Sequence, residues 1–391
     1  MCSFDALPSD STLGFALDFY HAVRSVQKNH NLIFSPVSIG LGLGMLELGT
    51  GGTTLQQLRK GLHFDGTQEG KEFSAMKKLL KIISTDSEEN KLNLASAIYI
   101  QARYPLNEQY LLNNQDTFNS SVRKLDFQDA MSAASNINAW VVRQTHGKVK
   151  DLFSSASFSP LTRLVLVNAI YFKGTWKHKF SQDNTSVTKF TKSDGSVLHI
   201  PIMHQQVKSK LGYFTADEVS YQVLELPYSG DESSMILALP AEGTDLTELE
   251  KLITPQIVEN WLSTIAEEDV EIYLPRFKTE QKLDLKEPLR TLNITEIFET
   301  RGDLSGISDS PDLYISEAVH QAFIELNEEG SEAAASTGMT LAVMSLSRHQ
   351  FNATRPFMFI IRNNLSGSIL FVGRVLDPEM TSGSAKDTEA L

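Results

Sequence analysis

The chain has 391 residues, of which 41% are hydrophobic and 21% charged, as is typical of a globular protein with a large core. Its formal net charge is −13. An acidic protein repels the phosphate backbone, so nucleic acid is not expected as a partner. Cys2 is the only cysteine, which excludes an intrachain disulfide and a zinc site built on several cysteines.

The N-terminal residues contain no apolar run of signal-peptide length, because Asp5, Pro8 and Asp10 interrupt them. No stretch approaches the roughly 18 consecutive apolar residues of a membrane span. We therefore expect a cytoplasmic protein with no membrane partner. Five N-x-S/T sequons leave unconventional secretion or an extracellular role open. These sequons begin at Asn119, Asn184, Asn293, Asn352 and Asn364.

Helices are expected in the first third of the chain. After Asp10 and Ser11, apolar residues between Phe15 and Val26 recur near helical spacing. Pro36 opens a second segment, which has glycines at positions 40, 42 and 44. These glycines would weaken an exposed helix, but they suit a helix that packs closely against a sheet.

Strands are expected mainly later in the chain, where β-branched, leucine and aromatic residues gather between turn signals. The expected strands span residues 92–100, 161–172, 221–228, 234–240 and 270–277. Residues 132–153 have helical spacing instead. Near the C-terminus, residues 357–362 and 368–375 form two further expected strands joined by a turn.

Catalytic signatures are missing from the sequence. It contains no G-x-S-x-G, H-E-x-x-H or Walker A pattern, and no G-x-G-x-x-G after a strand. The nine histidines lack metal-ligand spacing. We therefore expect neither an enzyme nor a bound metal or cofactor.

The most unusual stretch is 328–351, which is rich in small residues and lies in a region free of proline from 312 to 355. In a strand, alternate side chains share one face. One such set carries no charge, and the early charge of Glu332 falls on the opposite set. The uncharged set is Ser331, Ala333, Ala335, Thr337, Met339, Leu341 and Val343. The segment therefore suits insertion into a sheet, although an alanine-rich helix is the alternative.

Several motifs occur in a fixed order along the chain. They are Asn31 with FSPVS (34–38), NAIYFKGTW (168–176), DLSG (303–306), AVH (318–320), EEGSEAAAST (328–337), RPF (355–357) and LFVGRV (370–375). With these motifs the chain resembles the serpin superfamily over about residues 10–380. The absence of a leader and of cystine resembles its ovalbumin-like branch. Asn293 stands where the family usually has glycine, and asparagine tolerates left-handed backbone angles.

The resemblance implies an α+β fold with three β-sheets, about nine helices and an exposed reactive-centre loop. It implies a single domain over residues 1–380. We expect the remaining polar tail, 381–391, to be disordered.

The resemblance also implies a serine-protease inhibitor that acts as a suicide substrate. The target protease would cleave the loop and remain bound as an acyl-enzyme while the loop inserts into the main sheet. The partner is therefore a serine protease held in a covalent complex with a monomeric inhibitor. The implied hinge consists of Glu328, Glu329, Gly330, Ser331, Glu332, Ala333, Ala334, Ala335, Ser336 and Thr337.

The reactive bond follows from the family's register, in which the specificity residue lies 14 positions after the hinge glycine. Counting from Gly330 gives Met344, with cleavage before Ser345. Methionine suits elastase-like or chymotrypsin-like proteases. Leu346 is a chymotrypsin-type alternative, and Arg348 would direct the inhibitor to trypsin-like proteases.

Five further residues match family positions beneath and above the main sheet. Ser35, Ser38, Asn168 and His320 match the shutter, where polar side chains hold the strands, and Trp176 matches the breach at the top of the sheet. The main alternative function is a non-inhibitory serpin that acts as a carrier or chaperone. The uncharged Ser331, Ala333 and Ala335 argue against that alternative.

Overall fold

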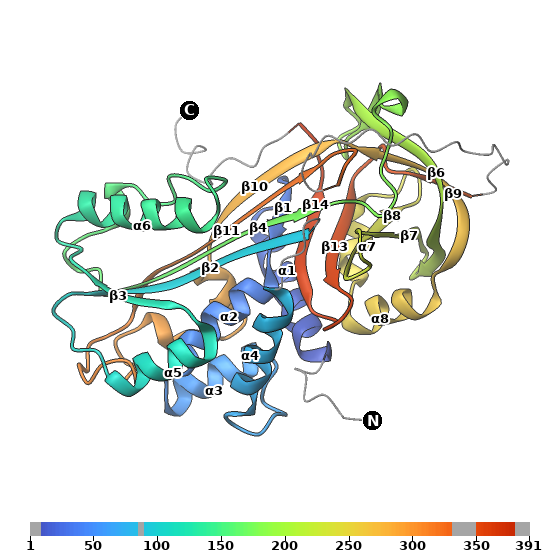
Figure 1. The fold of residues 1–391 in the computed structure, drawn as a ribbon. Helices are drawn as coiled ribbons and strands as arrows, with labels where there is room; N and C mark the ends of the chain where they lie inside the picture. The colour runs from blue at the N-terminus through green and yellow to red at the C-terminus, as the bar shows by residue number, and fades with distance from the viewer. Residues whose placement is uncertain (1–8, 85–89, 331–348, 380–391) are drawn as a thin grey trace.

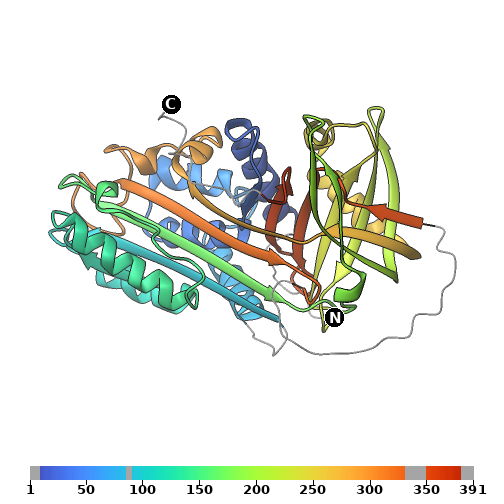
Figure 2. The same cartoon turned by 90° about the horizontal axis from the view of Figure 1, so that it is seen from above.

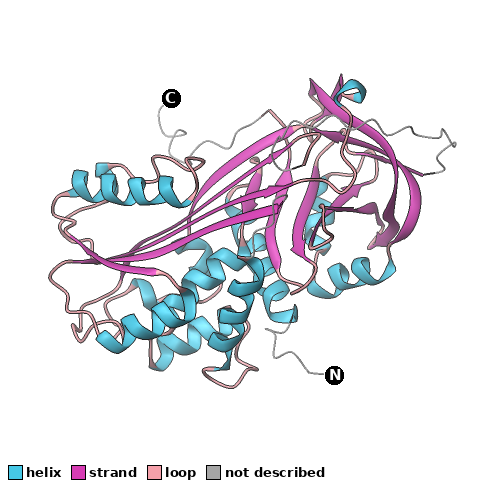
Figure 3. Ribbon diagram, in the orientation of Figure 1, coloured by secondary structure: helices cyan, strands magenta, loops and turns pink. Residues whose placement is uncertain are grey.

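The computed structural model describes residues 9–84, 90–330 and 349–379, which form both helices and strands (Figures 1 and 3). The helices of these residues are α1 (Ser9–Val26), α2 (Pro36–Glu47), α3 (Gly52–Gly61), α4 (Lys71–Ile83), α5 (Glu108–Phe118), α6 (Ala130–Gln144), α7 (Leu246–Leu252), α8 (Pro255–Thr264) and α9 (Lys286–Thr291). The first seven strands are β1 (Leu32–Phe34), β2 (Asn90–Gln101), β3 (Ser121–Leu125), β4 (Leu164–Gly174), β5 (Ser186–Thr191), β6 (Val197–Ala216) and β7 (Val219–Pro227). The other seven are β8 (Ser233–Pro240), β9 (Ala266–Pro275), β10 (Phe277–Asp284), β11 (Ile315–Leu326), β12 (His349–Asn352), β13 (Phe357–Asn363) and β14 (Ile369–Val375).

A five-stranded sheet in the order β10-β11-β4-β2-β3 runs through the elongated half of the molecule. Its central strand, β4, is buried along nearly its whole length, as its run of valine, leucine and isoleucine predicts. Helix α6 covers one face, and α2 to α5 lie on the other (Figure 2). Strands β4 and β11 are parallel neighbours, whereas β10 and β2 pair with them antiparallel.

The second sheet contains nine strands in the described residues, in the order β1-β14-β13-β8-β7-β6-β9-β12 with β5 paired to β6. Three sheets were expected, but hydrogen bonding joins the strands into two. The physical reason is the 20-residue strand β6. Residues 197–202 at the start of β6 pair with β5, residues 210–216 at its end pair with β7, and residues 202–211 between them pair with β9.

Helix α2 lies against β4, where the sequence predicts a closely packed helix. The side chain of Ser35 caps its first turn by accepting a hydrogen bond from the Ser38 amide, and Pro36 occupies the first helical position. A side chain at Gly42 would contact Leu166 and Asn168 of β4. Nearly every residue of α2 is buried, so this helix fills the space between the sheet and the outer helices.

The helix expected over residues 132–153 is shorter than predicted and ends at Gln144. After it, His146 and Gly147 adopt left-handed backbone angles, which break the helical path. Val149 and Leu152 are buried in irregular structure, so their apolar character reflects packing under α6 instead of helical periodicity. The strand expected from residue 161 begins only at Leu164.

A buried ion pair joins α7 to β14. The guanidinium of Arg374 donates to both carboxylate oxygens of Glu250, at 2.9 and 3.1 Å, and both side chains are almost fully enclosed. Tyr20 of α1 donates a further hydrogen bond to Glu250. Backbone carbonyls, including that of His30, accept the remaining hydrogens of Arg374. The charges are therefore fully paired, which is the condition for tolerating them inside a fold.

Replacement of Arg374 by methionine should leave the Glu250 carboxylate buried without its hydrogen-bonded counter-ion, with only Arg24 nearby at 3.8 Å. We expect the free energy of unfolding to fall by about 3–5 kcal/mol in urea titrations. Lys251→Met on the same helix is the control, because Lys251 pairs only with an exposed carboxylate in the described residues. This control should change stability by no more than about 0.5 kcal/mol. Equal effects of the two substitutions would contradict the assignment of Arg374 and Glu250 as a stabilising buried ion pair.

Candidate functional site

The junction between β4 and β11 places two polar residues at the centre of an apolar sheet. His320 of β11 lies opposite Asn168 of β4 in the parallel register, and both side chains are completely buried. The Nδ1 of His320 is hydrogen bonded to Oδ1 of Asn168. The two strands are thus joined by a side-chain contact in addition to their backbone ladder.

The hydrogen bonds of His320 fix its tautomer. The backbone N–H of Ser35 can only donate, so Nε2, at 3.0 Å, must accept. Nδ1 therefore carries the proton and donates to Asn168. Burial lowers the pKa of His320 to about 3, so the imidazole is neutral at physiological pH.

Helix α2 supplies the other members of this cluster. The Ser38 hydroxyl donates to Oδ1 of Asn168 at 2.7 Å, and the Asn168 amide donates to the Ser38 carbonyl at 2.8 Å. The same amide donates to the Ser96 hydroxyl of β2 at 2.7 Å. The structure therefore brings together Ser35, Ser38, Asn168 and His320, and it adds Ser96, which the sequence analysis missed.

At one end of the junction, the chain leaves β11 through a tight turn, 327–330. The backbone N–H of Asn327 donates to the carbonyl of Gly330 at 2.8 Å. The indole of Trp176 donates to the Asn327 carbonyl at 3.0 Å and stacks on Tyr228 with ring centroids 4.6 Å apart. Trp176 therefore packs directly against this turn.

Two glutamates hold this turn in place. Glu328 accepts hydrogen bonds from the Thr185 hydroxyl at 2.7 Å and from Arg276 at 2.5 Å. Burial raises the pKa of Glu328, but these hydrogen bonds outweigh it and leave the pKa below its usual value. Glu329 forms an ion pair with Lys179 at 2.7 Å. Arg276 and Lys179 could not be predicted from the sequence, since isolated cations carry no pattern.

Gly330 has a backbone φ of +138°, a conformation that residues with a side chain rarely adopt. A Cβ atom here would also overlap the carbonyl oxygen of Gly174. Gly330 forms an antiparallel bridge with Thr175, immediately after β4, and another with Asn327. The chain therefore already runs antiparallel to both β4 and β11 at this point.

The remaining loop positions named from the sequence lie outside the described residues. They are Ser331, Glu332, Ala333, Ala334, Ala335, Ser336, Thr337, Met339, Leu341, Val343, Met344, Ser345, Leu346 and Arg348. The proposed tail, 381–391, also lies outside them.

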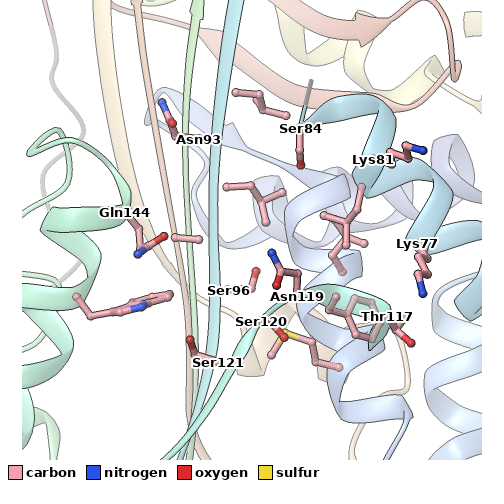
Figure 4. Close-up of a pocket in the computed structure, with 18 of the residues that line it drawn as sticks. Lys77, Lys81, Ser84, Asn93, Ser96, Thr117, Asn119, Ser120, Ser121 and Gln144 are labelled. Carbon is pink, nitrogen blue, oxygen red and sulfur yellow. The ribbon is translucent and has the colours of Figure 1, made fainter. Parts of the chain in front are cut away.

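A cavity of about 710 Å³ adjoins β2 and is lined by residues of α4 and α5 on one face of the sheet and of α6 on the other. Its lining includes Lys77 and Lys81 of α4, Asn93 and Ser96 of β2 and Gln144 of α6 (Figure 4). It therefore lies close to the polar cluster, since Ser96 belongs to both.

Among residues 9–84, 90–330 and 349–379, no three histidine, cysteine or carboxylate side chains gather closely enough to hold a metal ion. No helix in this part of the chain is sufficiently long and apolar to cross a membrane.

A family model described as "Serpin (serine protease inhibitor)" matches residues 10–378. Human Serpin I2 is 50% identical over 378 residues, which cover 96% of this chain and 93% of that protein. Neuroserpin from Gallus gallus is 40% identical, with coverage of 98% and 95%. Leukocyte elastase inhibitor from Sus scrofa is 38% identical, with coverage of 93% and 97%. The chain belongs to the serpin family.

Solved structures confirm the fold. Uncleaved ovalbumin superposes with a TM-score of 0.87 at 30% identity, covering 95% of this chain and 99% of ovalbumin. Human thyroxine-binding globulin complexed with thyroxine superposes with a TM-score of 0.88 at 26% identity, with coverage of 96% and 98%. The expected α+β serpin fold is therefore confirmed. The family is one of protease inhibitors, although the solved structures similar to this chain include non-inhibitory serpins.

The neutral state of His320 predicts a specific pH dependence. Unfolded histidine takes up a proton below about pH 6.5, whereas the native residue resists protonation down to about pH 3. The native state therefore binds fewer protons, and its free energy of unfolding falls as pH drops from 6.5 towards 3, by about 1.4 kcal/mol per unit.

Urea titrations between pH 4.5 and 8 would measure this dependence against the variant His320→Gln, which keeps an acceptor for the Ser35 amide. The wild type should lose stability more steeply than the variant on acidification. His199→Gln, at an exposed position of β6, should leave the slope close to that of the wild type. Identical slopes for wild type and His320→Gln would show that His320 is not buried in its neutral form.

Proposed function

We propose that this chain is a monomeric, single-domain serine-protease inhibitor that acts as a suicide substrate and is cleaved between Met344 and Ser345. The protease serine attacks the carbonyl carbon of Met344, the peptide bond breaks, and the amine of Ser345 leaves with a proton. The ester is trapped because residues 331–344 enter the five-stranded sheet, which corresponds to the main sheet of the family, between β4 and β11. At roughly 3.3 Å per residue, this insertion carries the protease about 46 Å.

The observation that carries this proposal is the strand register at Gly330. Gly330 forms antiparallel bridges with Thr175 and with Asn327. In an antiparallel pair, each residue further along one strand lies opposite a residue one position further back on its partner. Seven steps from Gly330 reach Thr337, and seven steps back reach Asn168 on β4 and His320 on β11. These two residues are already opposite each other, so one inserted strand fits both neighbours.

The same register determines which loop side chains turn inward. Paired residues on neighbouring strands point to the same face. The side chains of Asn168 and His320 point towards α2, where they contact Ser38 and Ser35, so Thr337 takes the inward face. The inward set then includes Ala335 and Ala333, as the sequence pattern suggests, and the charge of Glu332 falls outward.

Insertion also requires β4 and β11 to separate. The polar cluster would have to exchange the contact between His320 and Asn168 for contacts to the new strand, and the Thr337 hydroxyl arrives at that position. The cavity beside β2 offers space for a shift of β2 and β4 away from β11. The first three residues of the hinge, Glu328, Glu329 and Gly330, remain the pivot.

Methionine at the scissile bond favours elastase-like or chymotrypsin-like targets, because its unbranched apolar side chain fits their primary pockets. The similarity to leukocyte elastase inhibitor supports this choice. Cleavage after Leu346 would retain a chymotrypsin-like target. Cleavage after Arg348 would select trypsin-like proteases, but it requires an inserted segment four residues longer.

Incubation with elastase-like, chymotrypsin-like and trypsin-like proteases tests the function. We expect an SDS-resistant adduct with one of the first two, and a released C-terminal peptide that begins at Ser345 in mass spectra. The nicked protein should melt at a higher temperature than the intact one, because the inserted strand adds hydrogen bonds and buried apolar surface. Met344→Arg should transfer adduct formation to the trypsin-like protease.

The second candidate function is a carrier without inhibitory activity, which the likeness to thyroxine-binding globulin supports. A carrier would give loop cleavage, continued protease activity and an unchanged melting temperature. Such a result would reject the inhibitor and leave the fold assignment intact.

A matched pair of variants tests insertion itself. Ala335→Glu would place a carboxylate inward, opposite buried Ile170 and Ala322 in the inferred register, and burying that charge is costly. Ala334→Glu would place it on the other face, opposite Tyr171 and Phe323, which are also buried but have lysines over their rings that can pair with the carboxylate. We expect adduct formation to fall by roughly tenfold or more for Ala335→Glu, and to persist for Ala334→Glu. Equal adduct yields would contradict the register.

A further inference from the structure

Near the C-terminal end of α2, two carboxyl groups share one cation. Glu47, the last residue of α2, and Glu72 of α4 have side chains with no exposed surface. Arg59 of α3 donates a hydrogen bond to Oε1 of Glu72. Its closest approach to Glu47 is 3.6 Å, which is too long for a hydrogen bond.

The guanidinium of Arg59 is committed elsewhere. It donates to the backbone carbonyls of Phe64 at 2.9 Å and Thr67 at 2.5 Å. Three of the four carboxyl oxygens consequently have no hydrogen-bond partner among the described residues, namely both oxygens of Glu47 and Oε2 of Glu72. Buried polar atoms in native proteins are almost always hydrogen bonded, so these three oxygens require an explanation.

The same nitrogen, Nη1 of Arg59, contacts Oε1 of both Glu47 and Glu72, so the two carboxyl groups are neighbours, and a hydrogen bond between them in the protonated form contributes to the raised pKa of Glu47. Two carboxylates are both acceptors and repel, whereas a carboxylic acid donates to a carboxylate. One proton would therefore satisfy two of the unpaired oxygens. It would also reduce the buried charge of the cluster from −1 to zero, because Arg59 is the single cation in contact.

We propose that Glu47 and Glu72 bind one proton between them in the native protein at neutral pH, with Glu47 as the acid that donates to Glu72. The proton joins the end of α2 to the start of α4, while Arg59 joins α4 to α3. This site is independent of the inhibitory function and of the loop.

The surroundings of Glu47 support this assignment. Burial raises the pKa of Glu47 to about 9, and the Glu72 carboxyl beside it acts in the same direction. Arg59 acts in the opposite direction, and the exposed Glu69 before α4 adds a weaker upward effect. Glu47 is the only charged residue of α2, so no other group on that helix opposes the shift.

Infrared spectroscopy in D2O near neutral pD tests the proposal directly. The wild type should show the carbonyl stretch of a protonated carboxylic acid, and Glu47→Gln should lack it. Glu250→Gln is the matched control, because Glu250 is equally buried but both its oxygens accept from Arg374. Its removal should leave the band in place. Absence of the band in the wild type, or its persistence in Glu47→Gln, would overturn the proposal.

The pH dependence of the unfolding constant gives a second test of the shared proton. The native site holds its proton up to about pH 9, whereas an unfolded glutamate loses it near pH 4.3. The native state therefore binds the extra proton between these values, and its stability falls as pH rises. In urea titrations between pH 6 and 8, the ratio of the unfolding constants of wild type and Glu47→Gln should rise about tenfold per pH unit. A constant ratio would contradict the shared proton.

If Glu47→Gln fails to fold, the wild type alone still decides. In protein labelled with ¹³C at the glutamate carboxyl carbon, one resonance should stay at the position of the protonated acid until the pH approaches 9. If every glutamate resonance has moved to the ionised position by about pH 6, the site does not hold a proton and the proposal fails.

Discussion

The direct parallel pairing of β4 with β11 is the constraint on which the rest of the molecule depends. Parallel ladders are slightly weaker per residue than antiparallel ones, and one strand running in the opposite direction would pair antiparallel with both neighbours. The chain reverses direction at 327–330 directly after β11, so in the proposed mechanism the residues that follow Gly330 would supply such a strand. The weaker junction and the start of its proposed replacement are then adjacent in one polypeptide.

Helix α2 connects this junction to the outer helices through polar groups at both its ends. At its N-terminus, Ser35 and Ser38 contact the neutral imidazole of His320 and the amide of Asn168. At its C-terminus, Glu47 lies beside a second carboxyl group. Both titratable groups avoid charge in the native state, the histidine by resisting a proton and the glutamate by keeping one. The helix is therefore disturbed by acid at one end and by alkali at the other.

The sequence predicts the central strand and the packing of α2 well, because both depend on local composition. The apolar run of β4 indicates burial on two faces, and Gly42 indicates close approach to a sheet. The left-handed angle of Asn293 (φ +62°) was also predictable, since asparagine tolerates it. The length of β6 was not, because its polar residues and Pro201 hide a strand that three neighbouring strands stabilise. Nor were Arg276 and Ser96, whose roles depend on partners far away in sequence.

Two observations support the same inward face for the loop in the proposed inserted state. Composition favours the uncharged alternate set, from Ser331 to Val343, as the inward one. The register of the Gly330 bridges, extended into the sheet, would bring Thr337 opposite Asn168 and His320 and so on the inward face. An alanine-rich helix would explain the composition, but its period of 3.6 residues gives no reason for a two-residue alternation to coincide with the sheet register. A one-residue slip would have turned every inward residue outward, and it would have brought Glu332 into the core. The agreement in parity therefore favours a segment built to enter the sheet over one whose composition merely suits a helix.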